Sequence, residues 1–285
     1  MVKAGSNIMD NRFHRTLLLL GEEGSERLRA AHVAVFGLGG VGSYACESLA
    51  RAGVGRLTIV DFDKVGVTNI NRQNIAFSDT VGRAKVEVMA ERIALINSEC
   101  QVISLPEFFC EENSDQILSG GFDAVVDAID SFNPKIRLLV ESLRLQLPIF
   151  SAMGAAGKID PSKIRVGDIS ESTICPMARR IRKRLRVFDV ETGIRVVYSI
   201  EPPILPFSPE TIEADKKEFS LKRGRERMIQ GTISYLPALF GLTLAGMVVQ
   251  HLTGFSTARE TRKEEEGASA DCADDAYRRA EMPAP

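Results

Sequence analysis

The stretch V-A-V-F-G-L-G-G-V-G-S-Y-A-C-E-S-L, residues 33–49, decides the fold of this 285-residue chain. An apolar run ends at Gly37, and a helix-like pattern begins at Gly42. Together with Gly39 these glycines fit the spacing G-x-G-x-x-G, and Gly40 is an additional glycine. Glycines allow a tight turn there and let phosphate oxygens approach backbone N–H groups at a helix start. The stretch therefore predicts a strand, a nucleotide-binding loop and a helix.

Apolar runs and helical patterns alternate through the first half of the chain. The predicted strands lie at residues 32–37, 56–61, 101–105, 122–128 and 148–152, and the predicted helices at 42–52, 83–97 and 134–146. Such alternation is typical of a parallel sheet with helices on both faces. We therefore expect an α/β fold with a Rossmann-like, mostly parallel sheet and a nucleotide-binding half over residues 1–155.

The second half, residues 156–256, has a less regular pattern. The basic run at residues 178–186 predicts a helix. Residues 236–252 are the most apolar segment, but they are shorter than the roughly 20 residues of a membrane span, so we expect a buried core helix. Residues 257–285 are polar with few large apolar side chains and predict a disordered tail.

Composition argues against several classes of protein. A net charge of -2 argues against a generally basic nucleic-acid coat, although local patches are compatible with it. The five cysteines form no C-x-x-C pair, so neither a zinc knuckle nor a disulfide framework is indicated. The first residues lack the apolar core of a secretory signal. We expect a cytoplasmic protein without a membrane partner.

Polar residues after the glycine loop change its interpretation. Asp61 ends the second predicted strand 19 residues after Gly42, where a ribose-binding carboxylate belongs, and this alone would predict a dehydrogenase. An arginine and a lysine beside carboxylates suit a triphosphate and its Mg²⁺ instead, because cations balance phosphate charge and a carboxylate holds the metal. The residues of this set are Asp61, Asp63, Asn69, Asn71, Arg72, Gln73, Lys85, Asp127 and Asp130.

In order and spacing these motifs resemble the ubiquitin-activating-enzyme-like superfamily, which includes the ThiF and MoeB adenylyltransferases. The matching segments are R-F-H-R-T-L-L-L-L-G, G-L-G-G-V-G-S, D-F-D, N-x-N-R-Q, V-G-R-A-K-V-E and D-A-I-D-S, over residues 12–155. The resemblance implies ATP and Mg²⁺ as cofactors. It implies that Asp61 holds the ribose and that Asp130 binds Mg²⁺. It also implies contacts with the phosphates from Gly39, Gly40, Asn71, Arg72, Gln73 and Lys85. Gly37, Gly42, Asp63, Asn69 and Ser131 complete the expected nucleotide site. Arg15 resembles the arginine that reaches into the partner's site in dimeric members, and its other reading is a charge on a helix surface.

The second half resembles the tRNA threonylcarbamoyladenosine dehydratase branch of this superfamily. The similar segments include S-A-M-G-A-A-G-K-I-D-P-S-K-I, Y-S-I-E-P-P and R-M-I-Q-G-T-I-S-Y-L-P-A-L-F-G-L-T-L-A-G. The resemblance implies ATP-dependent cyclisation of threonylcarbamoyladenosine at position 37 of tRNA, a homodimer, and as further candidates a monovalent cation and a sulfur-relay protein. Some members have a cysteine in the segment after R-M, and this chain has none there.

The expected mechanism needs no enzyme nucleophile. The substrate carboxylate attacks the α-phosphorus of ATP, pyrophosphate leaves, and an internal nucleophile of the substrate then displaces AMP, a step that proximity can drive. Cys175 precedes Pro176 near a helix start and is the candidate for a covalent alternative. Its other reading is a small buried residue. Cys46 is expected in the core.

Two basic runs are the candidate tRNA-binding surface. Concentrated positive charge on a chain that is neutral overall suits a polyanion that docks at one place, although such runs are also typical of a solvated helix face. The first run comprises Arg179, Arg180, Arg182, Lys183, Arg184 and Arg186, and the second Lys222, Arg223, Arg225 and Arg227.

Three other functions are weighed against this one. A dehydrogenase is disfavoured by N-I-N-R-Q and the paired aspartates. An adenylyltransferase for a ubiquitin-like sulfur-carrier protein shares the first half, but such enzymes usually carry two C-x-x-C zinc pairs, which are missing here. A non-catalytic binding module would be expected to have lost Arg72, Lys85 or Asp130, and all are present.

Overall fold

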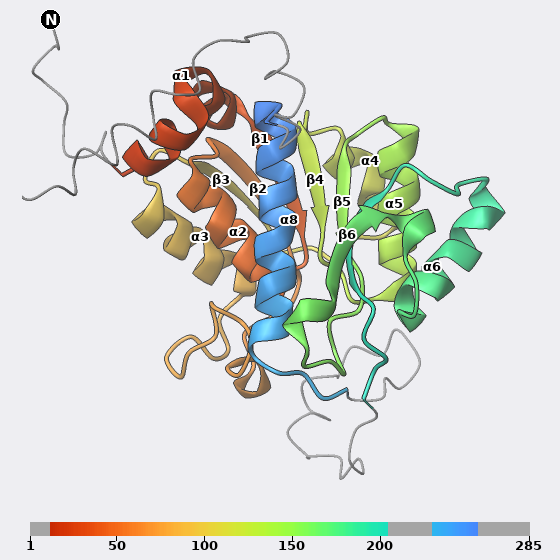
Figure 1. The fold of residues 1–285 in the computed structure, drawn as a ribbon. Coiled ribbons are helices and arrows are strands. Elements are labelled where there is room, and N and C mark those ends of the chain that lie inside the picture. The colour runs from red at the N-terminus through yellow and green to blue at the C-terminus, as the bar shows by residue number, and fades with distance from the viewer. Residues whose placement is uncertain (1–11, 205–229, 256–285) are drawn as a thin grey trace, which may run out of the picture.

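A seven-stranded sheet forms the centre of the molecule (Figure 1). The computed structural model describes residues 12–204 and 230–255. The strand order is β3-β2-β1-β4-β5-β7-β6, and every neighbouring pair is parallel except β6 with β7. The strands are β1 (His32–Phe36), β2 (Arg56–Val60), β3 (Gln101–Leu105), β4 (Ala124–Asp127), β5 (Ile149–Ala152), β6 (Ile164–Asp168) and β7 (Arg195–Ser199). The predicted α/β fold with a mostly parallel sheet is confirmed.

Helices cover both faces of the sheet. They are α1 (His14–Ala30), α2 (Gly42–Ala52), α3 (Lys85–Ile96), α4 (Glu111–Leu118), α5 (Phe132–Arg144), α6 (Pro176–Leu185) and α8 (Tyr235–Thr253), with short 3-10 helices η2 (Val67–Asn69), η3 (Pro161–Lys163), η4 (Ile169–Glu171) and η5 (Arg186–Phe188). Alternate strand residues point to opposite faces. Val33 and Val35 belong to the core shared with α2, α3 and α8, whereas Ala34 and Phe36 belong to the core shared with α4, α5 and α6.

The sequence predicts most elements of the first half and two helices of the second. Strands β1 to β5 and helices α2, α3, α5, α6 and α8 agree with their predicted ranges to within two residues at each end. Strands β6 and β7 and helices α1 and α4 are not predicted. No residue of β6, at the sheet edge, is buried, and its sequence lacks the apolar run that marks the central strands.

Helix α8 is the core helix that the sequence predicts. Among residues 12–204 and 230–255 it is the single helix with the length and hydropathy of a membrane span. Its residues Leu236, Phe240 and Leu244 are fully buried, and it packs on α1, α2, β5 and β7. A Cβ at Gly241 would lie 2.2 Å from the carbonyl oxygen of Val41, so this glycine brings α8 against the start of α2.

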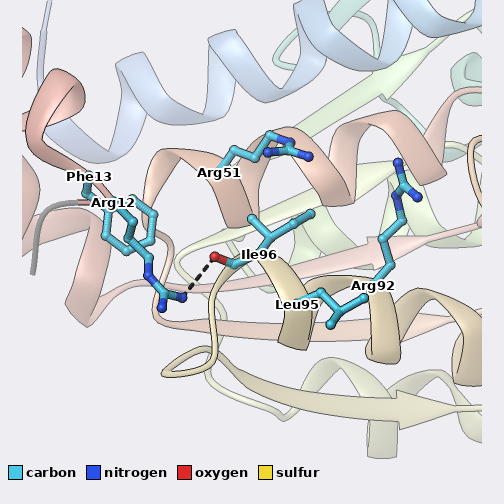
Figure 2. Close-up of a pocket in the computed structure, with 6 residues that line it drawn as sticks. All are labelled: Arg12, Phe13, Arg51, Arg92, Leu95 and Ile96. Carbon is cyan, nitrogen blue, oxygen red and sulfur yellow. Dashed lines mark hydrogen bonds between the residues drawn. The ribbon is translucent and has the colours of Figure 1, made fainter. Parts of the chain in front are cut away.

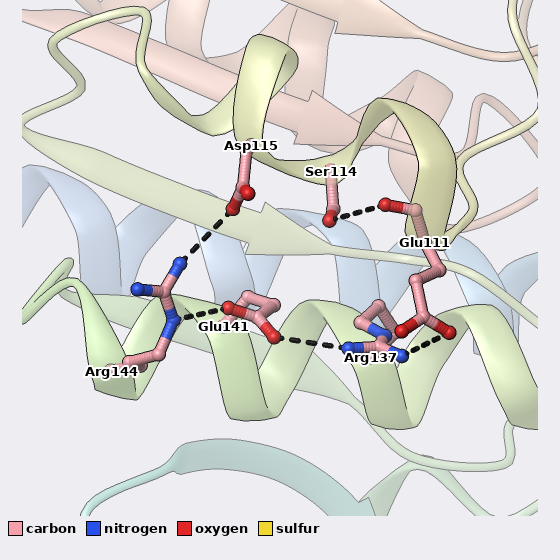
Figure 3. A network of polar contacts seen from close by, with 6 residues as sticks. All are labelled: Glu111, Ser114, Asp115, Arg137, Glu141 and Arg144. Carbon is pink, nitrogen blue, oxygen red and sulfur yellow. Dashed lines mark hydrogen bonds and ion pairs between the residues drawn. The ribbon is translucent and has the colours of Figure 1, made fainter.

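Charged side chains join α4 to α5 on the other face of the sheet (Figure 3). Glu141 accepts from Arg144 at 2.5 Å and from Arg137 at 3.1 Å, while Arg144 also reaches Asp115 of α4 at 3.0 Å. The hydrogen bond from Arg144, helped by Arg137, holds the pKa of Glu141 below its ordinary value against the effect of burial. The network fixes α5, whose first turn follows the predicted Mg²⁺ ligand Asp130.

Both halves of the chain contribute to one sheet. Strand β7, from the second half, pairs with β5 from the first, and β6 extends the sheet beyond it. The division at residue 155 therefore stays a prediction about function and does not correspond to a break in the sheet. The predicted tail at residues 257–285 lies outside the described residues.

Candidate active site

The glycine loop connects the carboxyl end of β1 to the start of α2. Gly37 has φ +89°, a conformation that favours glycine. A Cβ at Gly42 would lie 1.7 Å from the carbonyl oxygen of Gly37, so only glycine lets the helix start so close to the strand. At Gly39 the nearest atom to such a Cβ is Gln73 Nε2, 3.9 Å away. A side chain at residue 39 would fill the space at the helix N-terminus where a phosphate is bound in such folds.

Asp61 lies directly after β2 and is 8% exposed. Its Oδ2 accepts a hydrogen bond from the Leu38 N–H at 2.6 Å, and its Oδ1 accepts from the Asp63 N–H at 2.8 Å. Burial raises the pKa of Asp61, and the nearby Lys85 ammonium opposes that effect. The carboxylate thus ties the glycine loop to the end of β2, and it keeps lone pairs for a ribose hydroxyl.

Lys85 begins α3 beside this carboxylate. Its Nζ lies 2.9 Å from Asp63 Oδ2 and 4.0 Å from Asp61 Oδ2, and the residue is 5% exposed. Its backbone N–H also donates to the Asp63 carbonyl oxygen at 3.0 Å. Lys85, Asp61 and Asp63, separated in sequence, therefore form one charged group at the carboxyl end of β2.

The N-x-N-R-Q segment lies over the glycine loop. Arg72 donates to the Thr68 carbonyl oxygen at 2.7 Å, and a Cβ at Gly40 would lie 3.3 Å from Arg72 Cγ. Gln73 is 6% exposed, and its Oε1 has no hydrogen-bond partner among the described residues. A buried acceptor without a partner costs free energy, so the donors of a bound nucleotide would suit this position.

Two asparagines of the predicted set have structural partners. Asn69 Oδ1 accepts from the Gly66 N–H at 3.1 Å and caps η2. Asn71 Nδ2 donates to the Thr232 carbonyl oxygen at 3.0 Å, which ties this loop to the segment before α8. That segment is the one in which some relatives of the branch carry a cysteine, so the structure brings it to the edge of the site.

Asp130 lies in the turn between β4 and α5 and is exposed. Ser131 Oγ lies 3.2 Å from Asp130 Oδ1. The turn packs on the glycine loop, because the Ala128 carbonyl oxygen would lie 2.8 Å from a Cβ at Gly37. The carboxyl ends of β1, β2 and β4 thus bring together the glycine loop, the Lys85 group and Asp130, as the rule for ligands of open α/β sheets predicts.

Sequence reasoning did not single out two buried residues beneath this turn, Lys135 and Ser151. Both contact Asp127, at 2.6 Å each. Lys135 is 1% exposed, and a lysine is almost never so buried without a partner. In the sequence, Lys135 is the second residue of the predicted helix at 134–146. It follows Asp127 and Asp130, which lie at the end of a predicted strand.

Cys175 caps the start of α6 and is 1% exposed. A Cβ at Gly154 would lie 3.9 Å from its sulfur, so the thiol faces the segment after β5. Cys46 is fully buried between α2 and the sheet, as expected, and burial raises its pKa far above the ordinary value. The burial of Cys175 favours a packing role over that of a nucleophile.

Arg15 is exposed in the first turn of α1. Residues just before α1 and within it contact the far ends of the helices that cover the sheet. Phe13 lies near Gly53 after α2, and Arg12 donates to the Ile96 carbonyl oxygen at the end of α3. Arg27 of α1 donates to the Thr253 carbonyl oxygen at the end of α8. These ends lie opposite the glycine loop. Arg15 is therefore remote from the site of its own chain.

The first basic run forms a stripe along α6. Arg179, Arg180, Lys183 and Arg184 are exposed on the helix, and Arg186 is exposed in η5. Arg182 points elsewhere, because its guanidinium donates to the Ser172 carbonyl oxygen at 2.5 Å and to its hydroxyl. The second basic run, Lys222, Arg223, Arg225 and Arg227, lies outside the described residues.

The stripe on α6 contacts the start of α5 beside the site. The guanidinium of Arg180 lies over the ring of Phe132, 5.0 Å from its centroid. Phe132 is the first residue of α5 and follows Asp130 and Ser131. Positive charge therefore extends from the surface of α6 to the turn that carries the predicted metal ligand.

A pocket of about 460 Å³ lies elsewhere on the molecule (Figure 2). It is lined by Arg12, Phe13, Arg51, Arg92, Leu95 and Ile96. Arg51 and Ile96 lie at the carboxyl ends of α2 and α3, so the pocket is at the opposite end of α2 from the glycine loop. Its position gives it no part in the chemistry described above.

Known proteins are similar to this chain in sequence. The tRNA threonylcarbamoyladenosine dehydratase of Bacillus subtilis (strain 168) is 41% identical over 244 residues, which cover 86% of this chain and 95% of that protein. The sulfur carrier protein adenylyltransferase of Thermus thermophilus is 40% identical, but the match covers 43% of this chain and 45% of that protein.

Solved structures give the same result. The crystal structure of the E. coli tRNA N6-threonylcarbamoyladenosine dehydratase, TcdA, in complex with AMP has a TM-score of 0.78 and 36% identity, and covers 89% of this chain and 98% of that one. The complex of the same protein with ATP has a TM-score of 0.77 and 34% identity, and the match covers 93% of this chain and 100% of that one. The profile of the ThiF family matches residues 13–284. The chain belongs to the ThiF family.

Proposed function

We propose that this chain is an ATP-dependent tRNA threonylcarbamoyladenosine dehydratase. It activates the carboxylate of threonylcarbamoyladenosine at position 37 of tRNA and closes the ring, with release of AMP and pyrophosphate. The observation that carries the proposal is the convergence of the glycine loop, Asp61, Lys85, Arg72 and Asp130 at one sheet edge, in a chain similar over nearly its whole length to dehydratases. The match to the sulfur-carrier enzyme, which covers less than half of the chain, supports the shared adenylation half alone.

Two cationic residues balance charge in the first step. As a carboxylate oxygen attacks the α-phosphorus and the bond to pyrophosphate breaks, negative charge grows on the leaving phosphates. Arg72, next to Gly40, and Lys85, next to Asp61, would balance that charge. The Lys85 ammonium lies 2.9 Å from Asp63 Oδ2, so phosphate oxygens would compete with this carboxylate for hydrogen bonds from the ammonium.

The second step needs geometry more than a protein nucleophile. An internal nucleophile of the threonylcarbamoyl group attacks the activated carbonyl, the bond to AMP breaks, and the overall loss from the nucleoside is one water. Holding the two groups together can supply most of the rate. The 1% exposure of Cys175 supports this route over a covalent one.

The residues present fit a magnesium ion. Mg²⁺ is usually held by one or two carboxylates together with substrate phosphates and waters. Among the described residues no group of three or more His, Cys, Asp or Glu could form a protein cage, whereas Asp130 is an exposed carboxylate beside the glycine loop. Asp130, with Ser131 beside it, would hold the ion. When bound, it would neutralise phosphate charge.

We also propose that the enzyme is a cytoplasmic homodimer. Arg15 is remote from its own site, so a role in adenylation requires a second chain. Leu18 and Leu19, on the same helix, are 69% and 71% exposed and suit a contact surface. The free thiols of Cys46, Cys100, Cys110 and Cys175 fit a reducing compartment.

An isotope experiment tests the adenylation step. The substrate tRNA would carry ¹⁸O in both oxygens of the threonylcarbamoyl carboxylate. If the carboxylate attacks phosphorus, one labelled oxygen stays on phosphorus when AMP leaves, so mass spectrometry should find AMP with one ¹⁸O. Unlabelled AMP formed at the rate of cyclisation would exclude an acyl-adenylate.

A further inference from the structure

A fully buried charged cluster lies directly beneath the turn that carries Asp130. It comprises Asp127 at the end of β4, Ser151 in β5 and Lys135 in α5, which are 0%, 0% and 1% exposed. Lys135 Nζ lies 2.6 Å from Asp127 Oδ2, and Ser151 Oγ donates to the same oxygen at 2.6 Å. None of the three can reach a bound nucleotide directly, because all are enclosed between the sheet and α5.

Two further bonds of the cluster go to one residue, Ile129. Asp127 Oδ1 accepts from the Ile129 N–H at 3.1 Å, and Lys135 Nζ donates to the Ile129 carbonyl oxygen at 3.1 Å. The ion pair therefore holds both polar groups of the residue that immediately precedes Asp130. The peptide that joins Ile129 to Asp130 is fixed in direction by a buried ammonium group.

Stability alone does not explain this arrangement. Removing two charges from water costs about as much as their attraction returns, and apolar residues of similar volume often stabilise a core equally well or better. An apolar pair could not form the two directional hydrogen bonds to Ile129.

We infer that Lys135 and Asp127 are positioning residues that aim Asp130 and Ser131 at the metal and phosphates of bound Mg·ATP. The inference rests on the proposed function of this site. Groups that orient a metal ligand typically change metal affinity by roughly 10- to 100-fold when they are replaced. The effect should therefore appear in metal binding, and much less in the binding of nucleotide without metal, because the glycine loop and Asp61 are not part of the cluster.

The direct variant, Lys135→Met, leaves the Asp127 carboxylate buried without its partner and could unfold the protein. The double variant Asp127→Asn/Lys135→Met removes both charges, and its asparagine oxygen can still accept from Ile129. Ser151→Ala is the matched control, because it removes a hydrogen bond to the same carboxylate but none to Ile129. Circular dichroism and thermal unfolding would establish that each variant is folded.

Binding of Mn²⁺, measured by electron paramagnetic resonance with a non-hydrolysable ATP analogue, is the first readout. ATP binding in EDTA, measured by calorimetry, is the second. We expect the double variant to lose Mn²⁺ affinity by roughly 10- to 100-fold. Its ATP affinity in EDTA should stay within twofold of wild type, and Ser151→Ala should change neither value by more than threefold.

Wild-type affinity for Mn²⁺ in the folded double variant would overturn the inference, as would an equal loss of ATP affinity in EDTA. Equal losses of Mn²⁺ affinity in Ser151→Ala and the double variant would also overturn it, because they would indicate a general effect of the core. Neither readout uses tRNA, so an error in the proposed substrate would leave these outcomes intact. Failure of wild type to bind Mn²⁺ with the ATP analogue would contradict the proposed adenylation itself.

Discussion

The carboxylate of Asp61 serves two purposes in an environment whose burial opposes its charge. It holds the glycine loop through the Leu38 N–H, and it is the predicted ribose ligand. Both purposes favour the ionised form, whereas burial favours the neutral one and raises its pKa above the ordinary 3.8. The fold therefore pays a desolvation cost to keep this carboxylate ionised.

Asp61→Asn should weaken ATP binding, because the amide nitrogen would face a backbone N–H and one charge-assisted acceptor is lost. Hydrogen bonds to charged groups contribute about 1.5–3 kcal/mol, so the affinity should fall by roughly 10- to 100-fold in calorimetry. Asp79→Asn, at an exposed loop position, is the control and should bind ATP normally.

The stability of the wild type relative to Asp61→Asn should depend on pH. Because the folded pKa of Asp61 is raised, the folded state binds a proton more readily than the unfolded state between the ordinary 3.8 and the folded value. The wild type should therefore gain stability relative to Asp61→Asn as the pH falls through this window. A difference in Tm that stays constant from pH 7 to pH 4 would contradict the raised pKa.

Cys175→Ser should leave cyclisation nearly unchanged, within about twofold in kcat, because the thiol is buried and catalysis is assigned to proximity. Steady-state assays of the cyclic nucleoside would measure it. Near-total loss of turnover in a folded variant would instead establish the covalent route.

The role of a residue was predictable from the sequence where the spacing of a motif determines it. It was not predictable where the role depends on the direction of the side chain. The glycine spacing and the position of Asp61 at a strand end needed no structure. Arg182 was grouped with the surface arginines, although the buried positions Ala178, Ile181 and Leu185 already place it on the flank of the buried face. Lys135 could not be assigned, because its contacts with Asp127 at the end of β4 and with Ile129 in the next turn depend on the direction of its side chain.

At the scale of elements, the contact of α8 with α2 supports the glycine loop. Gly241 lies against Val41, which is the residue before α2. A side chain at residue 241 would collide with the backbone of Val41, which moves less readily than a side chain. The core helix of the second half is thus coupled to the nucleotide site of the first.

Gly241→Ala should lower the free energy of unfolding by about 1–3 kcal/mol, a typical cost of overpacking, and should also weaken ATP binding. Gly246→Ala is the matched control in the same helix, because a Cβ there meets no atom within 4 Å. It should be neutral or stabilise by up to about 1 kcal/mol. Thermal unfolding and calorimetry would measure both, and equal behaviour of the two variants would contradict the role of the contact.

Several elements with a clear apolar pattern were predictable from the sequence. Central strands such as β1 are apolar at every residue after the first, and α8 is apolar over most of its length. By contrast, α4 is short and acidic, and a residue with helix-breaking backbone, Gly21 at φ +74°, interrupts α1. These elements depend on contacts with distant segments, so local periodicity does not reveal them.

At the scale of the whole molecule, the charged stripe on α6 is the proposed path of tRNA to the site. Arg180→Glu/Arg184→Glu should weaken tRNA binding and reduce the slope of log K against log salt by about 1–2, because each lost phosphate contact removes roughly one unit. Filter binding at several salt concentrations would measure it. Arg29→Glu, on exposed α1, is the control, and an unchanged slope in the α6 variant would exclude the stripe.

A dimer that shares its sites makes a different prediction. Arg15→Ala and Lys85→Ala should each be inactive alone. If the two variants are mixed in equal amounts and exchange subunits, half of the dimers are mixed. Each mixed dimer has one intact site of two, so activity should recover to about a quarter of wild type. No recovery, with exchange demonstrated by native mass spectrometry, would exclude Arg15 from the partner's site.

The most direct test of the account is pyrophosphate release from ATP by the purified protein. Release would be compared for tRNA that carries threonylcarbamoyladenosine and for the same tRNA without this modification, with mass spectrometry of the nucleosides in parallel. The account predicts release that depends on the modified tRNA, together with a nucleoside product lighter by one water. Equal release with both tRNAs, or release without a change in nucleoside mass, would contradict it.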